Sequence, residues 1–273
     1  MSQQLGLPGF DATTLAEPAK RARGKMSDKT MEKAAAKPAA PLFTMDDVKR
    51  IVEAKADEDR ANILTVGGTK GGGHKTSTAV NLATIAAQVL DLDVLLVDTD
   101  DRQKTTTRHF ERRERLGHSM ENLTVISLAD EAVRPNILKM AGKYGLVIVD
   151  CGGFDSVALR AAISISDRMV VPVAPKTYDY EAAAQAAQVI ANNRLPALRA
   201  FCVLSGAYPG AAQENEEFFE GLSKVKVWEM VPTYIRHRRI WDRAPREGLA
   251  VHEVKQADKT AIDEIARLAA LVL

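Results

Sequence analysis

The sequence predicts an α/β fold in which a mainly parallel, twisted sheet is flanked by helices on both faces. Three observations support this prediction: strand-like and helix-like segments alternate from Ile63 onward, the strand segments are continuous apolar runs, and a glycine-rich turn joins the first strand to the first long helix. Alternation of this kind produces a parallel sheet with helices on each side. Strands of such a sheet are buried on both faces and therefore read as unbroken apolar runs.

The elements follow one another in a regular order. A short helix over residues 45–56 is expected to precede the first strand. Helical periodicity, with apolar residues every three or four positions, appears over 78–89 and again over 262–271. The predicted strands are 63–67, 94–98, 123–127, 146–150, 169–173, 200–204 and 227–230.

The composition is that of a folded protein without a membrane span. Of the 273 residues 46% are hydrophobic and 27% charged, a globular balance. The two cysteines, Cys151 and Cys202, show no metal-ligand spacing and no disulfide framework. No secretory signal and no apolar run of about 20 residues is found, so we expect a cytoplasmic location. Because the net charge is only +1, nucleic-acid binding would need a local basic surface.

The first 44 residues differ from the rest. Residues 20–37 are rich in alanine and lysine, and the stretch AAAKPAAP resembles a linker. We expect residues 1–44 to be a disordered basic N-terminal extension, or one with a transient helix around residues 28–36, and residues 45–273 to form the folded domain. The lysines and arginines of the extension either contact DNA or a partner, or they belong to a solvated tail or to an artefact of cloning and of the start site.

The glycine-rich turn is the most informative segment. It reads Thr-Lys-Gly-Gly-Gly-His-Lys-Thr over residues 69–76, and the order strand, glycine-rich turn, helix predicts a phosphate-binding loop. Glycines let successive backbone N–H groups approach phosphate, and the following helix presents its positive end to the same charge. Lys75 would reach the β- and γ-phosphates, and Thr76 would bind Mg²⁺. The predicted nucleotide-binding residues are Lys70, Gly71, Gly72, Gly73, His74, Lys75, Thr76 and Ser77.

One residue of this turn contradicts the pattern. His74 occupies the position where the motif has glycine, and a β-carbon resists the dihedral angles and close packing that glycine accepts. The imidazole must either point away from the phosphates or crowd them. Two interpretations stay open: weak or slow turnover, or a substitution tolerated because Gly71, Gly72 and Gly73 keep the turn adaptable. We favour nucleotide binding with reduced hydrolysis.

Acidic residues end two of the predicted strands. Asp98 and Asp100 follow one strand and Asp150 ends another. Ligand sites of parallel sheets lie at the carboxyl ends of the strands, so these side chains should converge beside the glycine-rich turn. Asp150 would hold a Mg²⁺-bound water. The alternative for each of the three is a helix cap or a turn residue.

Five segments in order carry a resemblance to a known family. TKGGGHKTSTAVNLA resembles the deviant Walker A box of the ParA/MinD family of dimeric ATPases, whose pattern is K-G-G-x-G-K-T. VLLVDTDD is similar to the second acidic motif, YGLVIVDCGG to the Walker B strand, and SDRMVVPVAP to the strand after it. TYIRHRRIWDRAPREGLAVHE resembles a late segment of ParA proteins. The resemblance spans residue 63 to the C-terminus and implies a P-loop fold, ATP and Mg²⁺.

The resemblance also assigns roles. It implies that Lys70 is catalytic and crosses a dimer interface to the partner's nucleotide. It places Asp98, with Thr76 and Asp150, in the magnesium set, and makes Asp100 the catalytic residue that orients the attacking water. The chain departs from the family twice: Asp101-Arg102 stands for Pro-Gln, and Gly152-Gly153 stands for Pro-Pro.

A basic cluster occurs late in the chain. Arg236, Arg238, Arg239 and Arg243 lie on a predicted turn-to-helix segment. Related ParA proteins bind DNA through basic residues near this segment, so Arg236, Arg238 and Arg239 are the predicted DNA contacts, and binding to phosphates would carry no sequence preference. The alternative is a solvated helix face, or internal salt bridges with Asp242 and Glu247.

The resemblance implies an ATPase that forms a homodimer with ATP, binds DNA non-specifically and drives plasmid or chromosome partition or cargo positioning. A ParB-like or other adaptor protein would stimulate its weak ATP hydrolysis. The location would be cytoplasmic and nucleoid-associated, without a membrane. The alternative is a hydrolysis-poor, nucleotide-gated DNA-binding or regulatory protein of the same fold.

Overall fold

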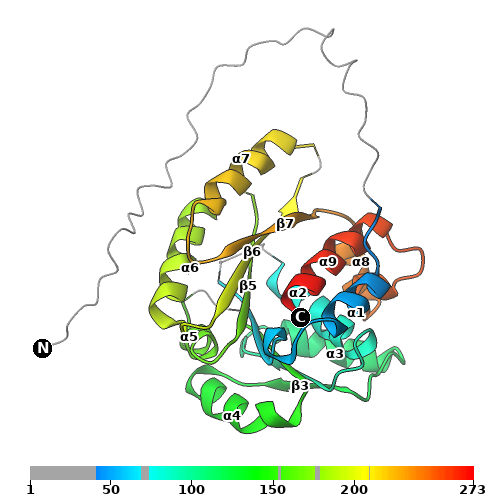
Figure 1. Cartoon of the computed structure of the whole chain (residues 1–273). Helices are drawn as coiled ribbons and strands as arrows, with labels where there is room; N and C mark the ends of the chain where they lie inside the picture. The colour runs from blue at the N-terminus through cyan, green and yellow to red at the C-terminus, as the bar shows by residue number, and fades with distance from the viewer. Residues whose placement is uncertain (1–40, 69–73, 153–154, 176–178, 209) are drawn as a thin grey trace, which may run out of the picture.

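The computed structural model describes residues 41–68, 74–152, 155–175, 179–208 and 210–273. It contains a seven-stranded sheet with the order β3-β2-β4-β1-β5-β6-β7, in which all neighbouring strands are parallel (Figure 1). The predicted α/β fold with a mainly parallel sheet is confirmed. The strands are β1 (Ile63–Val66), β2 (Val94–Asp98), β3 (Leu123–Ser127), β4 (Leu146–Asp150), β5 (Arg168–Val173), β6 (Arg199–Ala207) and β7 (Glu229–Arg236).

Helices cover both faces of the sheet. One apolar cluster packs α1, α2, α8 and α9 on one face, and a second packs α4, α5, α6 and α7 on the other (Figure 1). The central strands β1, β2, β4 and β5 are buried along their whole length, which accounts for their unbroken apolar sequences. The α-helices are α1 (Met45–Glu53), α2 (Lys75–Gln88), α3 (Thr105–Arg115), α4 (Val133–Met140), α5 (Val157–Ile163), α6 (Asp179–Asn193), α7 (Ala212–Ser223), α8 (Ile240–Arg246) and α9 (Lys259–Val272).

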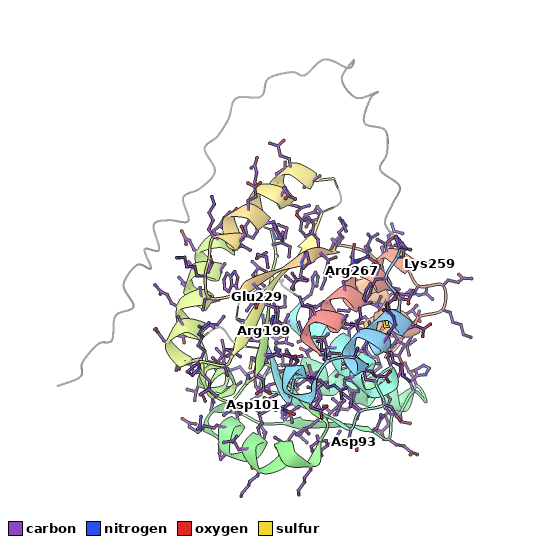
Figure 2. All side chains as sticks on the ribbon, viewed as in Figure 1. Asp93, Asp101, Arg199, Glu229, Lys259 and Arg267 are labelled. Atoms are coloured by element: carbon purple, nitrogen blue, oxygen red, sulfur yellow. The ribbon has the colours of Figure 1, made fainter. Side chains whose placement is uncertain are left out.

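The edge strand β7 is the main correction to the predicted elements. The sequence indicated a strand over 227–230, whereas β7 spans Glu229–Arg236 and contains Pro232. Proline lacks a backbone donor and normally ends a strand, but an edge strand tolerates it. Among the strands that the structure describes, β7 pairs with β6 alone. Arg199 and Glu229 form an ion pair of 3.2 Å where these two strands begin (Figure 2). β6 also extends to Ala207 rather than Leu204.

The ends of two helices differ from the predicted positions. α2 starts at Lys75, earlier than the predicted 78, and α1 ends at Glu53. Thr44 and Asp47 form a reciprocal capping box at the start of α1. The Phe43 N–H donates to Asp263 of α9 at 2.5 Å, so residues 43 and 44 of the predicted extension join the folded domain, while residues 1–40 lie outside the described residues. Within the described part of the chain, none of the helices has the length and apolarity needed to cross a bilayer.

Candidate functional site

The carboxyl ends of β1, β2 and β4 bring part of the predicted nucleotide and magnesium site together. Asp98 and Asp150 are direct neighbours in the β2–β4 register, and Val66, at the end of β1, is the neighbour of Asp150 on its other side. α2 begins at Lys75, so Lys75 and Thr76 lie in its first turn. The parallel arrangement of the strands therefore produces the predicted convergence of acidic residues and the helix N-terminus.

The two carboxylate oxygens of Asp150 differ in their hydrogen bonding within the described residues. Its Oδ2 accepts hydrogen bonds from the hydroxyls of Thr76 at 2.8 Å and Thr106 at 2.5 Å. Its Oδ1 is buried and has no hydrogen-bond partner among the described residues. Burial raises the pKa of Asp150 to about 6, although the two threonine hydroxyls act in the opposite direction. A buried carboxylate oxygen without a donor is unusual, and a Mg²⁺-bound water would satisfy it.

The residues around Asp150 fit a magnesium–nucleotide site. Thr76 offers a hydroxyl oxygen and Asp150 a carboxylate, which are the ligand types that Mg²⁺ prefers. Lys75 is half-buried, and burial lowers its pKa, while the carboxylates of Asp150 and Asp100 act to raise it. A phosphate placed beside Lys75 would add negative charge and favour the charged ammonium further.

Asp98 organises the turn that follows β2. Its Oδ1 accepts the backbone N–H of Asp100 at 3.0 Å, and its Oδ2 accepts both the N–H and the hydroxyl of Thr107 at 2.9 Å. Asp98 is 2% exposed. The carboxylate thus fastens the first turn of α3 to the sheet, in agreement with the turn-residue alternative. The magnesium role that the resemblance implies for Asp98 stays a prediction.

Asp100 fits against a glycine that lies just beyond the end of β4. Its Oδ1 accepts the N–H groups of Arg102 at 3.2 Å and Gln103 at 2.9 Å. A β-carbon added to Gly152 would lie 2.6 Å from Asp100 Oδ2 and 2.7 Å from Asp100 Cβ. Gly152 therefore leaves the space that Asp100 fills, which gives a physical reason for glycine where the family pattern has proline. The water-orienting role of Asp100 stays a prediction.

The glycine-rich turn is described only at its end. Lys70, Gly71, Gly72 and Gly73 lie outside the described residues, as does Gly153. His74 has the left-handed conformation, with φ 54° and ψ 32°, and precedes the first turn of α2. Its Nδ1 lies 3.1 Å from Ser205 Oγ at the end of β6. Ser77 is half-buried in the first turn of α2, where its carbonyl accepts from Asn81.

Three residues of this region were missed from the sequence. Thr106 and Thr107 contact Asp150 and Asp98, and Ser205 contacts His74. The run of three threonines from Thr105, directly after the second acidic motif, is a signal that could have found the first two, because hydroxyl residues favour helix starts beside carboxylates. Ser205 carries no local signal, since its partner is distant in the sequence.

The predicted DNA-contact arginines divide into two groups. Arg236 ends β7 rather than lying in a turn, and its backbone N–H and guanidinium both contact Glu264 of α9. Arg238 forms ion pairs with Asp258 at 2.9 Å and with Glu264 at 3.1 Å. Arg239 is exposed and forms no ion pair within the described part of the chain. Internal salt bridges therefore exist: Arg243 pairs with Glu247 at 2.7 Å, as the alternative expected. Arg236 and Arg238 pair instead with Glu264 and Asp258, which the sequence did not indicate.

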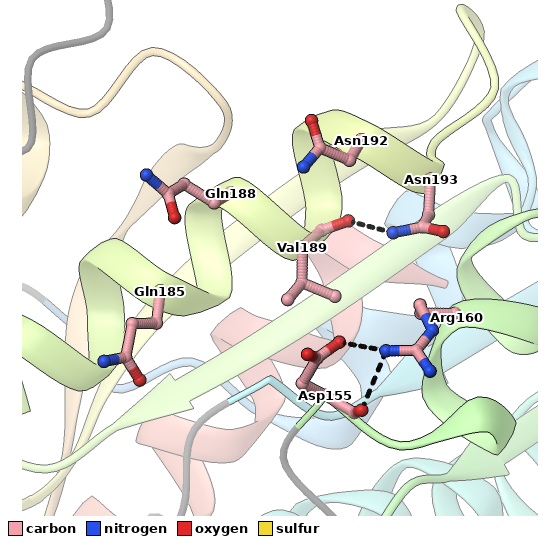
Figure 3. A pocket seen from close by; sticks show the side chains of 7 residues that line it. All are labelled: Asp155, Arg160, Gln185, Gln188, Val189, Asn192 and Asn193. Carbon is pink, nitrogen blue, oxygen red and sulfur yellow. Dashed lines mark hydrogen bonds and ion pairs between the residues drawn. The ribbon is translucent and has the colours of Figure 1, made fainter. Parts of the chain in front are cut away.

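A polar cavity of about 510 Å³ lies elsewhere, between the start of α5 and α6 (Figure 3). Arg160 donates to the carboxylate and the carbonyl of Asp155 at its edge. None of the predicted site residues that the structure describes lines this cavity, so it is distinct from the cluster at Asp150. The other lining residues, all on α6, are Gln185, Gln188, Val189, Asn192 and Asn193.

Comparisons with known proteins agree with the fold and the motifs. A family model described as ATPase MipZ matches residues 62–207, more than half of the chain. The Protein ParA of Rhizobium radiobacter is 32% identical over 48% of this chain and 56% of its own length. The Maintenance of carboxysome distribution protein A of Gloeobacter kilaueensis is 35% identical over 43% of this chain and 51% of its own length. The chain thus spans about half the length of these curated relatives.

Solved structures show the same fold. The septum site-determining protein MinD from Pyrococcus horikoshii, complexed with Mg-ADP, superposes with a TM-score of 0.59 at 17% identity, over 76% of this chain and 93% of that chain. Together with the sheet order and the phosphate-loop helix, the match over residues 62–207 settles the relationship. The chain belongs to the MipZ family of ATPases, within the ParA/MinD superfamily.

Proposed function

We propose that this protein is an ATPase that dimerises with ATP, binds DNA without sequence preference and uses the cycle to partition a replicon or position a cargo. The observation that carries the proposal is the buried Asp150 Oδ1 beside Thr76, which has no hydrogen-bond partner among the described residues and lies at the N-terminus of the helix that follows the phosphate-loop motif. This arrangement combines a positive helix end, a lysine and an oxygen ligand set in one place. The Mg-ADP complex of the related MinD fold supports the choice of nucleotide and metal.

The residues would share the work of phosphoryl transfer. Lys75 would neutralise phosphate charge, and Thr76 and Asp150 would hold Mg²⁺, which supplies further positive charge when bound. Asp100 would orient water, whose oxygen bonds to the γ-phosphorus while the bond to the bridging oxygen of ADP breaks. Asp98 keeps the turn that carries Asp100 in place. Positioning and charge neutralisation supply most of the catalysis in such reactions.

The relatives support a proposal for the cellular role. Lys70 would reach the partner's nucleotide in an ATP-bound homodimer, and Arg239, with Arg236 and Arg238, would contact DNA phosphates. An adaptor protein on the cargo would stimulate weak hydrolysis and release. The names of two relatives, a ParA protein and a carboxysome distribution protein, support partition or positioning rather than metabolism. We place the protein in the cytoplasm, on the nucleoid.

The decisive experiment measures DNA binding and oligomeric state with ATP, ADP and a non-hydrolysable ATP analogue. The proposal expects a dimer and DNA binding only with ATP or its analogue, and neither in Lys75→Ala. Phosphate release is then measured with and without DNA. Equal DNA binding without nucleotide, or an absence of ATP binding in the parent, would overturn the proposal.

A second candidate keeps the fold but removes most hydrolysis. It is a nucleotide-gated DNA-binding or regulatory protein, favoured by His74 in the left-handed conformation and by Asp101-Arg102 after the second acidic motif. The same assay separates the two candidates. ATP-dependent DNA binding without phosphate release, even when the adaptor is added, selects the regulatory protein.

A further inference from the structure

His74 adopts a backbone conformation that favours glycine, yet its side chain has a specific partner. Its φ of 54° lies in the left-handed region, which carries a free-energy cost for residues with a β-carbon. The imidazole Nδ1 lies 3.1 Å from Ser205 Oγ, across 131 positions of sequence. The ring is therefore directed to the end of β6, and the unfavourable backbone conformation is offset by a contact that glycine could not make.

The end of β6 is shaped to receive this ring. A β-carbon added to Gly206 would lie 3.0 Å from His74 Cε1 and 3.5 Å from its Nδ1, so the imidazole fills the space that a side chain would need. Ser205 is fully buried and is the neighbour of Ile235 in the β6–β7 register. The residues that contact the His74 ring, Ser205 and Gly206, thus belong to a strand of the sheet and not to a loop. The Ser205 hydroxyl can form a hydrogen bond with the His74 ring, and Gly206 leaves room for the ring because it has no side chain.

Three other left-handed residues of the described chain do not show this arrangement. Lys104 pairs with Asp101 and Asp155 with Arg160, both within a few residues. Asp91, with φ 53°, lies beyond the other end of α2, in the turn before β2. Simple tolerance of strain in a turn therefore describes those positions, whereas His74 joins two elements that are distant in the sequence.

We infer that His74 is a positioning residue that fastens the first turn of α2 to the end of β6, with Ser205 and Gly206 as its receptor. Lys75 and Thr76 follow His74 directly, so the fastening sets the direction in which they meet a phosphate. The inference rests on the proposed function, because it assumes that this helix start binds ATP. The contact accounts for histidine at the position where the family pattern has glycine: a side chain held by the sheet takes the place of a flexible residue.

A double-mutant cycle tests the inference. The affinity for ATP with Mg²⁺ is measured by calorimetry for the parent, His74→Gly, Ser205→Ala and the double variant. Each single change should weaken ATP binding about 3- to 10-fold, the range expected for one hydrogen bond. The double variant should be no weaker than His74→Gly alone, because both changes remove the same contact. Asp91→Gly, which also relieves a left-handed residue near α2, should leave the affinity unchanged.

Steady-state hydrolysis gives a readout that a purely structural role would not change. His74→Gly should raise KM for ATP more than it changes kcat at saturating ATP, since a released helix start holds the nucleotide less firmly. Thermal unfolding of His74→Gly and Asp91→Gly is measured in parallel and should differ little. Additive losses in the cycle, or an unchanged affinity in His74→Gly, would overturn the inference while ATP binding by the parent keeps the proposed function. A parent that binds no ATP would overturn both.

Discussion

At the scale of single residues, the site depends on which oxygen and nitrogen atoms the protein leaves for a ligand. Asp98 has both carboxylate oxygens occupied by backbone and hydroxyl donors. Asp150, its neighbour in the sheet, has one oxygen occupied and one without a partner among the described residues. Two aspartates with the same sequence context at strand ends therefore differ in availability, and Asp150 is the better metal-side candidate.

Lys75 is the residue whose loss should affect nucleotide binding most. Lys75→Ala should weaken ATP binding by about 2–3 kcal/mol, the range for a hydrogen bond to a charged group. Calorimetry with Mg²⁺ measures the change, and Lys139→Ala, on the exposed surface of α4, is the matched control. Equal affinities for the two variants would remove Lys75 from the phosphate site.

Gly152 should control hydrolysis through Asp100. Gly152→Ala would place a β-carbon within 3 Å of the Asp100 side chain, so Asp100 must move. We expect the rate of phosphate release to fall roughly tenfold or more, while ATP affinity changes by less than about twofold, because only the transition state needs the oriented water. Gly142→Ala is the control, since a β-carbon there meets nothing within 4 Å.

The comparison with Asp100→Ala completes this test. That variant should also bind ATP but hydrolyse it slowly, so that ATP-bound dimers accumulate on DNA. If Asp100→Ala hydrolyses ATP at the parental rate, the water-orienting role belongs to another residue. Gly152→Ala should then have no effect on turnover either.

At the scale of elements, α3 is joined to the segment after α8 by buried charges. Arg113, 3% exposed, donates to both carboxylate oxygens of Glu253 at 2.7 and 2.6 Å and to the carbonyl of Gly248 at 3.1 Å. His109, one turn earlier on α3, is 8% exposed and its Nε2 has no partner among the described residues. This helix therefore carries a buried neutral histidine beside a buried ion pair.

His109 should make stability depend on pH. Burial, reinforced by the charge of Arg113, lowers its pKa from 6.5 to about 4, whereas Glu253 acts in the opposite direction. Between these two values the unfolded chain binds a proton that the native protein does not, so this contribution to stability falls as the pH falls from about 6.5 to about 4. The full effect of one such group is about 3 kcal/mol.

Urea unfolding at a series of pH values measures this contribution. His109→Leu should flatten the dependence in that window, whereas His118→Leu, at an exposed histidine shortly after α3, should leave it unchanged. A parental slope that persists in His109→Leu would assign the dependence to other groups.

The elements also show what sequence patterns can and cannot predict. The central strands were predictable because a strand that is buried on both faces has apolar residues at nearly every position, as β2 and β4 do. β7 was misplaced because Pro232 has the local signature of a strand end, and only its edge position makes it acceptable. The acidic side chains were found through strand ends. The contact of His74 with Ser205 was not predictable, because it depends on the pairing of segments 131 positions apart.

At the scale of the whole molecule, DNA binding must be tested without unfolding the protein. Removing Arg236 and Arg238 would leave Glu264, 1% exposed, without its cationic partners, and an unpaired buried charge costs about 3–5 kcal/mol. Arg239 is exposed and free of that constraint. The arginines predicted together from the sequence therefore need different experiments.

Arg239→Glu should weaken ATP-dependent DNA binding for all sequences alike, while dimerisation and thermal stability stay at the parental level. Fluorescence anisotropy with two unrelated duplexes measures the binding. Lys139→Glu, which makes the same charge change on α4, is the control and should bind DNA like the parent. Loss of binding to one duplex only would point to base recognition and contradict the proposal.

Glu264 has a consequence for how such DNA binding would respond to salt. Arg236 and Arg238 share Glu264, and Arg238 also pairs with Asp258, so these two cations and two anions sum to no net charge. The dependence of affinity on salt reports the counterions that leave DNA, with a logarithmic slope of about −0.9 for each phosphate neutralised. Arginines that are already neutralised by acidic side chains of the same protein displace few counterions from DNA. The measured slope should therefore be shallower than the number of arginines on this surface suggests.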